Sequence, residues 1–168
     1  VHSLVQYNRV LAQRNRLLKD LSFHPEYEET MDVWDIQLVN YGKQVIEFRS
    51  QFILQLKDLI QEIHRSLSGG KEELLIHYEP HTEAEDFEEA LKRGRKQDIK
   101  QKTTLCGPHR DDVSFIVNGV DIRRYGSQGQ QRTAALSLKL SELQLVKLLI
   151  RDDPILLLDD VLSELDSS

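Results

Sequence analysis

The sequence predicts an α/β protein that combines an antiparallel helical arm with a lobe built on a mixed sheet. Apolar residues recur every three or four positions over residues 4–21 and again over residues 34–67, which is the spacing of one helix face. Further along, a hairpin pattern and a fully apolar run of strand length flank a long helical stretch. We therefore expect the arm in residues 1–68 and the lobe in residues 69–168.

The composition is that of a folded protein without membrane segments. Of the 168 residues, 39% are hydrophobic, and the net charge of -6 gives no overall reason to expect nucleic-acid binding, so any DNA contact must be local. The lone Cys106 cannot form an internal disulfide, and no apolar run is long enough to span a bilayer. We expect a cytoplasmic location and no membrane contact. Both ends interrupt patterned segments, so we also expect the chain to be part of a longer protein.

Two helices should form the arm. The first stripe consists of Leu4, Tyr7, Leu11, Arg14, Leu18 and Leu21. The second consists of Trp34, Leu38, Tyr41, Val45, Phe48, Phe52, Leu56, Leu59, Ile63 and Leu67. Because the turn at residues 22–25 is short, the helices should pack antiparallel. We expect the polar residues of these helices, among them Asn15 and the one polar member of the first stripe, Arg14, to lie on solvated surface.

A strand and a third helix follow the arm. Gly69-Gly70 should end the second helix, and residues 74–78 read as a short strand. A helix is predicted from Thr82, as N-cap, to about Lys96, with acidic residues in its early turns. Its basic end consists of Lys92, Arg93, Arg95 and Lys96. This charge order suits the helix dipole, and the same basic residues are candidates for contacting DNA phosphates.

The last third of the chain should contain the sheet. Asn118-Gly119 separates two strand-like runs and favours a type I′ hairpin turn. A long helix is predicted over residues 132–150, followed by the apolar strand 155–158. A helix that leads into such a strand indicates a layered sheet covered on both faces.

Two segments carry chemistry. Asp159 and Asp160 end the apolar strand, where buried carboxylates need a cation or hydrogen-bond donors; this is the Walker B arrangement of nucleotidases. Residues 125–132 precede the long helix, so the Ser127 hydroxyl, the glycine backbone and the first helical N–H groups can form an anion site. The alternative is that Ser127 only caps the helix.

The motifs resemble those of the RecF family of ATP-binding-cassette-type DNA-repair ATPases. The segments that carry the resemblance are residues 11–18, 34–38, 107–112, 126–133 and 157–166. The resemblance covers nearly the whole chain and implies the C-terminal two thirds of such a protein, without its Walker A loop. It implies an ATP-dependent homodimer that hydrolyses ATP slowly, binds gapped or double-stranded DNA and works with RecR and RecO to load RecA.

The resemblance also implies roles for individual residues. The contacts to the γ-phosphate of ATP held by the partner subunit would be Ser127, Gln128, Gly129 and Gln130. Asp159 would coordinate Mg²⁺, and Asp160 would orient or activate the attacking water. Ser163 and Asp166 would lie at the dimer interface. Related ATPases usually have Glu at the position of Asp160, so slow turnover is expected.

Several alternatives compete with this reading. Residues 67–72 spell a commoner version of the cassette signature, but they should close a helix, whereas a signature must open one. No Walker A loop occurs in the sequence, so the chain alone should not hydrolyse ATP. The rival functions are a non-catalytic helical module that binds RecR or DNA, and an SMC-like ATPase head, whose arm would be longer.

Overall fold

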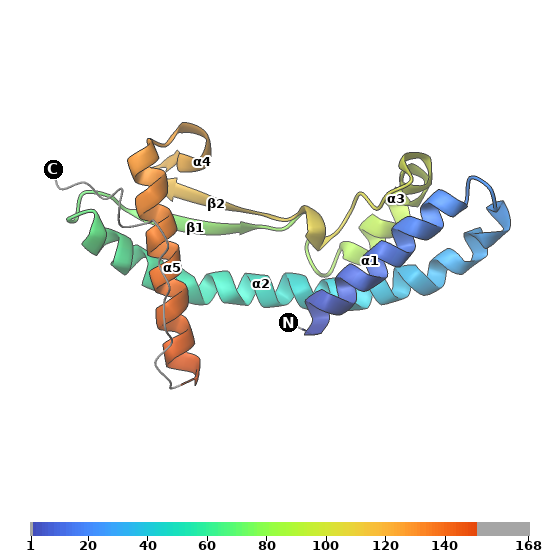
Figure 1. Cartoon of the computed structure of the whole chain (residues 1–168), viewed down its shortest axis with the longest axis horizontal. Coiled ribbons are helices and arrows are strands. Elements are labelled where there is room, and N and C mark those ends of the chain that lie inside the picture. The colour runs from blue at the N-terminus through green and yellow to red at the C-terminus, as the bar shows by residue number, and fades with distance from the viewer. Residues whose placement is uncertain (1, 151–168) are drawn as a thin grey trace. The chain divides into compact units, whose positions relative to one another are not determined.

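The computed structural model describes residues 2–150, so the predicted strand 155–158 and the residues Asp159, Asp160, Ser163 and Asp166 lie outside the described part. The elements are α1 (His2–Asp20), η1 (Pro25–Thr30), α2 (Met31–Leu67), β1 (Leu74–Glu79), α3 (Phe87–Gln101), η2 (Pro108–Arg110), β2 (Asp112–Val117), β3 (Val120–Asp121), α4 (Ile122–Tyr125) and α5 (Gln128–Ile150) (Figure 1). No helix among the described residues is long and apolar enough to cross a membrane.

The chain divides into two compact units, each made of two separate stretches. The arm unit contains the residues up to Gln51 and Tyr78–Asp112, and the sheet unit contains Phe52–His77 and the residues from Val113 onward. The expected domain division at residue 68 stays a prediction.

Within the arm unit, α1 pairs antiparallel with the first part of α2, as the stripes predicted (Figure 1). Ser3 Oγ near the start of α1 donates to Gln44 Oε1 over 2.7 Å, and Leu18 near its end packs with Met31 at the start of α2. The main core of the unit consists of Tyr7, Val10, Leu38, Val39, Val45, Ile46, Ala84, Phe87, Leu91 and Cys106. Apolar side chains of α1, α2 and α3 therefore meet in one cluster, and they hold the arm together by removing apolar surface from water.

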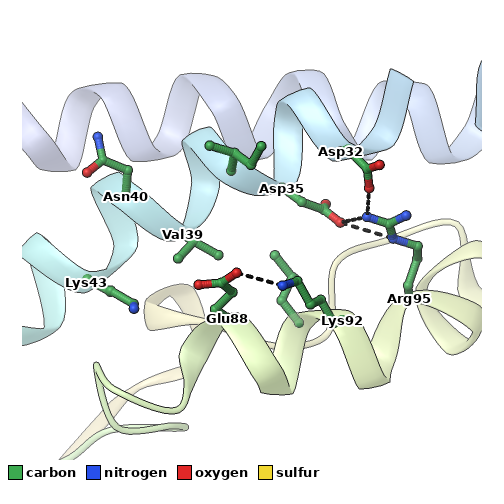
Figure 2. A pocket seen from close by; sticks show the side chains of 10 residues that line it. Asp32, Asp35, Val39, Asn40, Lys43, Glu88, Lys92 and Arg95 are labelled. Atoms are coloured by element: carbon green, nitrogen blue, oxygen red, sulfur yellow. Dashed lines mark hydrogen bonds and ion pairs between the residues drawn. The ribbon is translucent and has the colours of Figure 1, made fainter. Parts of the chain in front are cut away.

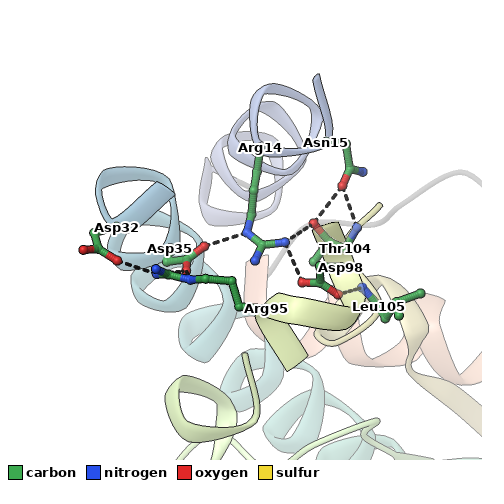
Figure 3. A network of polar contacts seen from close by, with 8 residues as sticks. All are labelled: Arg14, Asn15, Asp32, Asp35, Arg95, Asp98, Thr104 and Leu105. Atoms are coloured by element: carbon green, nitrogen blue, oxygen red, sulfur yellow. Dashed lines mark hydrogen bonds and ion pairs between the residues drawn. The ribbon is translucent and has the colours of Figure 1, made fainter. Parts of the chain in front are cut away.

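Arg14 is buried, which corrects the expectation that it lies on solvated surface. Its side chain is 0% exposed, and its Nε donates to Asp35 Oδ1 over 2.6 Å. Its Nη1 donates to Asp98 Oδ2 over 2.8 Å and to Thr104 Oγ1 over 2.7 Å (Figure 3). The carboxylates belong to α2 and α3, so helical periodicity within α1 could not reveal the pairing. A buried charge is tolerated here because it is paired and hydrogen-bonded.

The third helix begins later than predicted. Helix α3 starts at Phe87, and the Thr82 hydroxyl caps no helix; its hydrogen bond is to the Glu83 carbonyl oxygen at 3.5 Å. A turn precedes the helix, closed by the Asp86 amide donating to the Glu83 carbonyl oxygen over 3.2 Å. Phe87 is 0% exposed, so burial of its ring in the arm core fixes where the helix starts.

The segment after α3 is held tightly against α1. Gly107 has a φ of 131°, and a Cβ there would lie 2.6 Å from the Tyr7 hydroxyl oxygen and 2.9 Å from Phe87 Cζ. His109 Nδ1 lies 2.7 Å from the Tyr7 hydroxyl, and its Nε2 lies 3.0 Å from the Thr104 carbonyl oxygen. Burial lowers the pKa of His109, although part of its side chain is exposed. The neutral ring suits this geometry, with Nε2–H as donor and Nδ1 as acceptor.

The sheet unit contains strands in the order β1-β2-β3. Strands β2 and β3 are antiparallel, with Val117 opposite Val120, and the φ angles of Asn118 (48°) and Gly119 (83°) confirm the predicted I′-type turn. The core of this unit consists of Ile60, Leu74, Ile76, Val117, Ile122 and Ala134. The last turns of α2 and the start of α5 thus share one core with the strands.

Candidate functional site: the start of helix α5

Residues 125–132, the predicted anion site and hereafter the signature segment, lead into a helix. Helix α5 begins at Gln128, earlier than the predicted start at residue 132. The Gln130 amide donates to Ser127 Oγ over 3.1 Å, and in return the Ser127 amide donates to Gln130 Oε1 over 3.0 Å. This reciprocal pair is a capping box, which satisfies two backbone donors and starts the helix at a defined residue. The capping role considered for Ser127 is therefore present.

Capping leaves the segment able to receive an anion. Ser127, Gln128 and Gly129 are exposed, and the first turn of α5 contains no acidic residue. Since Ser127 Oγ accepts a hydrogen bond from a backbone amide, its own hydroxyl hydrogen can still be donated outward. The N-terminus of a 23-residue helix also carries a partial positive charge. Chemically, this exposed corner can bind a phosphate group.

Two residues that the sequence patterns did not indicate, Glu72 and His64, connect to the signature segment through Gln130. Gln130 Nε2 donates to Glu72 Oε1 over 2.9 Å, and Glu72 Oε2 lies 3.2 Å from His64 Nε2. His64 is 0% exposed, and its Nδ1 lies 2.9 Å from Ser137 Oγ. The spacing offered one indication, because His64 follows the core residue Ile60 by one helical turn of α2. The link to Glu72 and Ser137 depends on the tertiary fold and leaves no local pattern.

The segment 67–72 closes a helix, as predicted. Helix α2 ends at Leu67, and the amide of Gly70 donates to the Arg65 carbonyl oxygen over 2.7 Å. Gly69 and Gly70 have φ angles of 62° and 78°, which is the left-handed conformation common at helix C-termini. Residues 67–72 therefore resemble a cassette signature in sequence but not in structure.

The basic residues of α3 differ in availability. Lys92 Nζ pairs with Glu88 over 2.7 Å, and Arg95 pairs with Asp32 and, over 2.5 Å, with Asp35 (Figure 2). Arg93 and Lys96 are exposed, and within residues 2–150 neither forms an ion pair. Two of the four predicted DNA contacts thus already have carboxylate partners, which reduces the positive potential of this surface.

The predicted metal and hydrolysis residues follow the described part of the chain. The predicted ligand Asp159, the predicted catalytic Asp160 and the interface residues Ser163 and Asp166 lie outside the described residues. Among residues 2–150, no group of three or more His, Cys, Asp or Glu side chains is arranged to hold a metal ion.

Comparisons with known proteins agree with the motif reading. No family model matches the chain. It is 55% identical over 168 residues to "DNA replication and repair protein RecF" of Lachnospira eligens, and 55% identical over 166 residues to the protein of the same name from Agathobacter rectalis; each alignment covers 99% of this chain and 46% of the relative. The chain thus spans about half the length of these relatives, not two thirds.

Solved structures give the same result. A structure of the recombination mediator protein RecF with ATPrS, from the RecFOR pathway, has a TM-score of 0.89 and 38% identity and covers 98% of this chain and 47% of that one. The corresponding structure with ATP has a TM-score of 0.89 and 37% identity and covers 99% of this chain. Over nearly its whole length, in sequence and in fold, this chain is homologous to RecF.

Proposed function

We propose that this chain is part of an ATP-dependent, DNA-binding recombination mediator that acts in the cytoplasm. In this proposal the whole protein works at DNA gaps with RecO and RecR and helps to load RecA. The observation that carries it is the 55% identity to RecF across 99% of the chain, which includes both the arm and the signature segment. The two solved relatives are RecF with ATP or ATPrS in the RecFOR pathway, which supports ATP as the nucleotide.

The start of α5 is the proposed contact to ATP. The residues concerned are Ser127, Gln128, Gly129 and Gln130. The nucleotide would be held by a partner subunit, so that this helix start meets its γ-phosphate across a homodimer interface. The exposed, capped N-terminus and the absence of acidic residues in the first described turn of α5 support this assignment.

Hydrolysis would need the residues that follow the predicted strand. Asp159 is the proposed Mg²⁺ ligand, and Asp160 would hold or deprotonate the attacking water. Ser163 and Asp166 would lie at the dimer interface. A bound Mg²⁺ would neutralise charge on the phosphates of the nucleotide, and Asp159 and Asp160 would hold the metal and the attacking water in position. Because an Asp side chain reaches less far than Glu, we expect slow ATP turnover. We expect no turnover from these 168 residues alone, because they contain no Walker A loop.

The proposal can be tested in a protein of full RecF length that contains this chain. We expect Asp160→Asn to bind ATP without hydrolysing it. We expect Ser127→Arg to abolish ATP-dependent dimerisation, measured by analytical ultracentrifugation, because the larger side chain would occupy the phosphate position. Ser66→Arg is the matched control, since Ser66 is exposed on α2. If both site variants dimerise and hydrolyse ATP like the control, the composite-site assignment is wrong.

DNA contact is proposed at Arg93 and Lys96, the two of the four predicted DNA-binding residues that have no ion pair among the described residues. Replacing both with Ser should weaken DNA binding at all sequences and reduce the slope of log affinity against log salt by about one per residue. Lys92→Ser is the control, because Lys92 already pairs with Glu88. An unchanged slope in the double variant would place the DNA surface elsewhere.

A non-catalytic helical module that binds RecR or DNA is the second candidate. The closed arm unit, with its own core and buried ion pairs, favours it, since such a body can present a surface without using ATP. RecR and DNA binding that do not respond to ATP, or to Ser127→Arg, would support this candidate. An ATP requirement for both would exclude it.

A further inference from the structure

We propose that Gln130 is a positioning residue for the signature segment, and that Glu72, in the loop after α2, and His64, in the last turn of α2, hold it in place. This inference rests on the proposed function of the α5 start, and it changes the role of one residue there. Gln130 would not contact phosphate itself. It would fix Ser127 in the orientation that allows Ser127 to do so.

Both ends of the Gln130 amide group are already in use. Its Oε1 accepts from the Ser127 amide at 3.0 Å, and its Nε2 donates to Glu72 Oε1 at 2.9 Å. Gln130 is less exposed than Ser127, Gln128 and Gly129, its neighbours in the segment. Turning the Gln130 side chain toward a phosphate would break both hydrogen bonds and remove the half of the capping box that this side chain supplies. Binding and capping therefore compete for the same side chain, and the observed geometry favours capping.

Glu72 is itself fixed by a buried partner. Its second carboxylate oxygen, Oε2, lies 3.2 Å from Nε2 of His64, which is 0% exposed on α2. The other ring nitrogen lies 2.9 Å from Ser137 Oγ, which donates to the Thr133 carbonyl oxygen over 2.7 Å. His64 and Ser137 are both fully buried, so their positions are set by core packing.

The series of contacts leads back to the signature segment. Thr133 Oγ1 donates to the Gly129 carbonyl oxygen over 2.9 Å. This network contains side chains from α2, from the loop before β1 and from α5, and all of them belong to the sheet unit. Loss of one member of this network should loosen its direct neighbours, because each of them loses a fixed hydrogen-bond partner that mobile water would replace. The last turns of α2 therefore help to set the geometry of the start of α5 around Ser127.

The first test uses the chain itself and hydrogen exchange of the Ser127 and Gln130 amides. Glu72→Ala should accelerate their exchange about tenfold, and Glu73→Ala should not. Glu73 is a good control because it is the adjacent glutamate, and its side chain bonds only to Gln61, at 2.7 Å, among the described residues. Gln130→Met, which keeps the length of the side chain but removes its amide, should raise exchange at Ser127 equally. If Glu72→Ala and Gln130→Met both match the wild type, the positioning role is refuted.

The second test uses a protein of full RecF length. Glu72→Ala should raise the ATP concentration needed for half-maximal dimerisation about tenfold, while the affinity of the monomer for a fluorescent ATP analogue stays unchanged. Glu72→Gln should largely rescue dimerisation, because its amide oxygen can still accept from Gln130 Nε2. Lost nucleotide affinity in Glu72→Ala, or no rescue, would indicate a merely structural role and overturn the proposal.

The two tests also separate this inference from the proposed function. If the wild-type protein does not dimerise with ATP, the proposed function fails, and the exchange measurements still decide whether Glu72 and Gln130 position Ser127. If dimerisation occurs but Gln130→Met leaves it and the exchange of Ser127 unchanged, the proposed function stands and the positioning role is wrong.

Discussion

Replacing Arg14 with Met is the sharpest test of the arm unit. The substitution keeps most of the aliphatic volume but leaves two buried carboxylates without their shared cation. Asp98 is 1% exposed, and it loses the guanidinium nitrogen 2.8 Å away. Asp35 is 6% exposed and keeps Arg95 as a second partner. Breaking a buried pair by removing one partner costs about 3–5 kcal/mol. We expect a value near the lower end, because Asp35 remains paired.

The assay is urea unfolding followed by the fluorescence of Trp34, the only tryptophan in the chain. Trp34 is partly buried and packs against the arm core, so it reports on that unit. With an m-value of about 1–3 kcal/mol per molar urea, the midpoint should fall by about 1–3 M. Arg9→Met on the same helix is the control. Arg9 is exposed, and its replacement should change stability by less than about 0.5 kcal/mol.

A double-mutant cycle distinguishes lost pairing from lost packing. Asp98→Asn in the Arg14→Met background removes the uncompensated charge, so the double variant should be more stable than the sum of the single changes predicts, by about 1–3 kcal/mol. The asparagine amide introduced by this change is uncharged and costs less to bury than a carboxylate. If Arg14→Met loses less than about 1 kcal/mol, or if the two changes are additive, the buried pair does not stabilise the arm.

Three further predictions follow from local geometry. Gly107→Ala should destabilise the protein by about 2–4 kcal/mol in urea unfolding, because the new Cβ would clash with the Tyr7 hydroxyl and the backbone there has a positive φ. The control is Gly94→Ala, in open space within α3, which should stabilise the protein by about 1 kcal/mol. The pKa of His109 is lowered in the folded state, so the unfolded chain takes up a proton first as the pH falls through about 6.5. The free energy of unfolding should therefore decrease between pH 7 and 5. His109→Gln should make this decrease less steep, by at most about 1.4 kcal/mol per pH unit. Ser127→Ala should lower stability by about 1 kcal/mol through the lost cap, and an unchanged melting temperature would contradict the capping role.

Features that depend on local sequence patterns could be predicted: the arm helices, the hairpin turn and the position of the signature segment at a helix start. The two stripes predicted α1 and α2 because helices that bury one face repeat their apolar residues at helical spacing. The Asn118-Gly119 turn was predictable because few residues tolerate two successive positive φ angles. The place of the signature at a helix start followed from the same kind of reasoning.

What could not be predicted depends on contacts between distant residues. Arg14 lies on the apolar stripe of α1, but the carboxylate of Asp98 that makes its burial possible is on another helix. The start of α3 at Phe87, later than Thr82, reflects packing of one ring into the arm core. The link from Gln130 through Glu72 to His64 likewise joins three elements. Each of these is a tertiary effect that overrides or supplements local propensity.

The hairpin turn also determines where chains of this type can accept additional residues. Its two left-handed residues place Val117 opposite Val120, and Asn118 Oδ1 accepts from the Glu73 amide at 2.9 Å. One inserted residue would shift the pairing by one position and turn Val117, which is 1% exposed, toward the opposite face of the sheet. We therefore expect length differences among relatives to fall at exposed turns such as residues 22–24, and this hairpin to keep its two-residue turn.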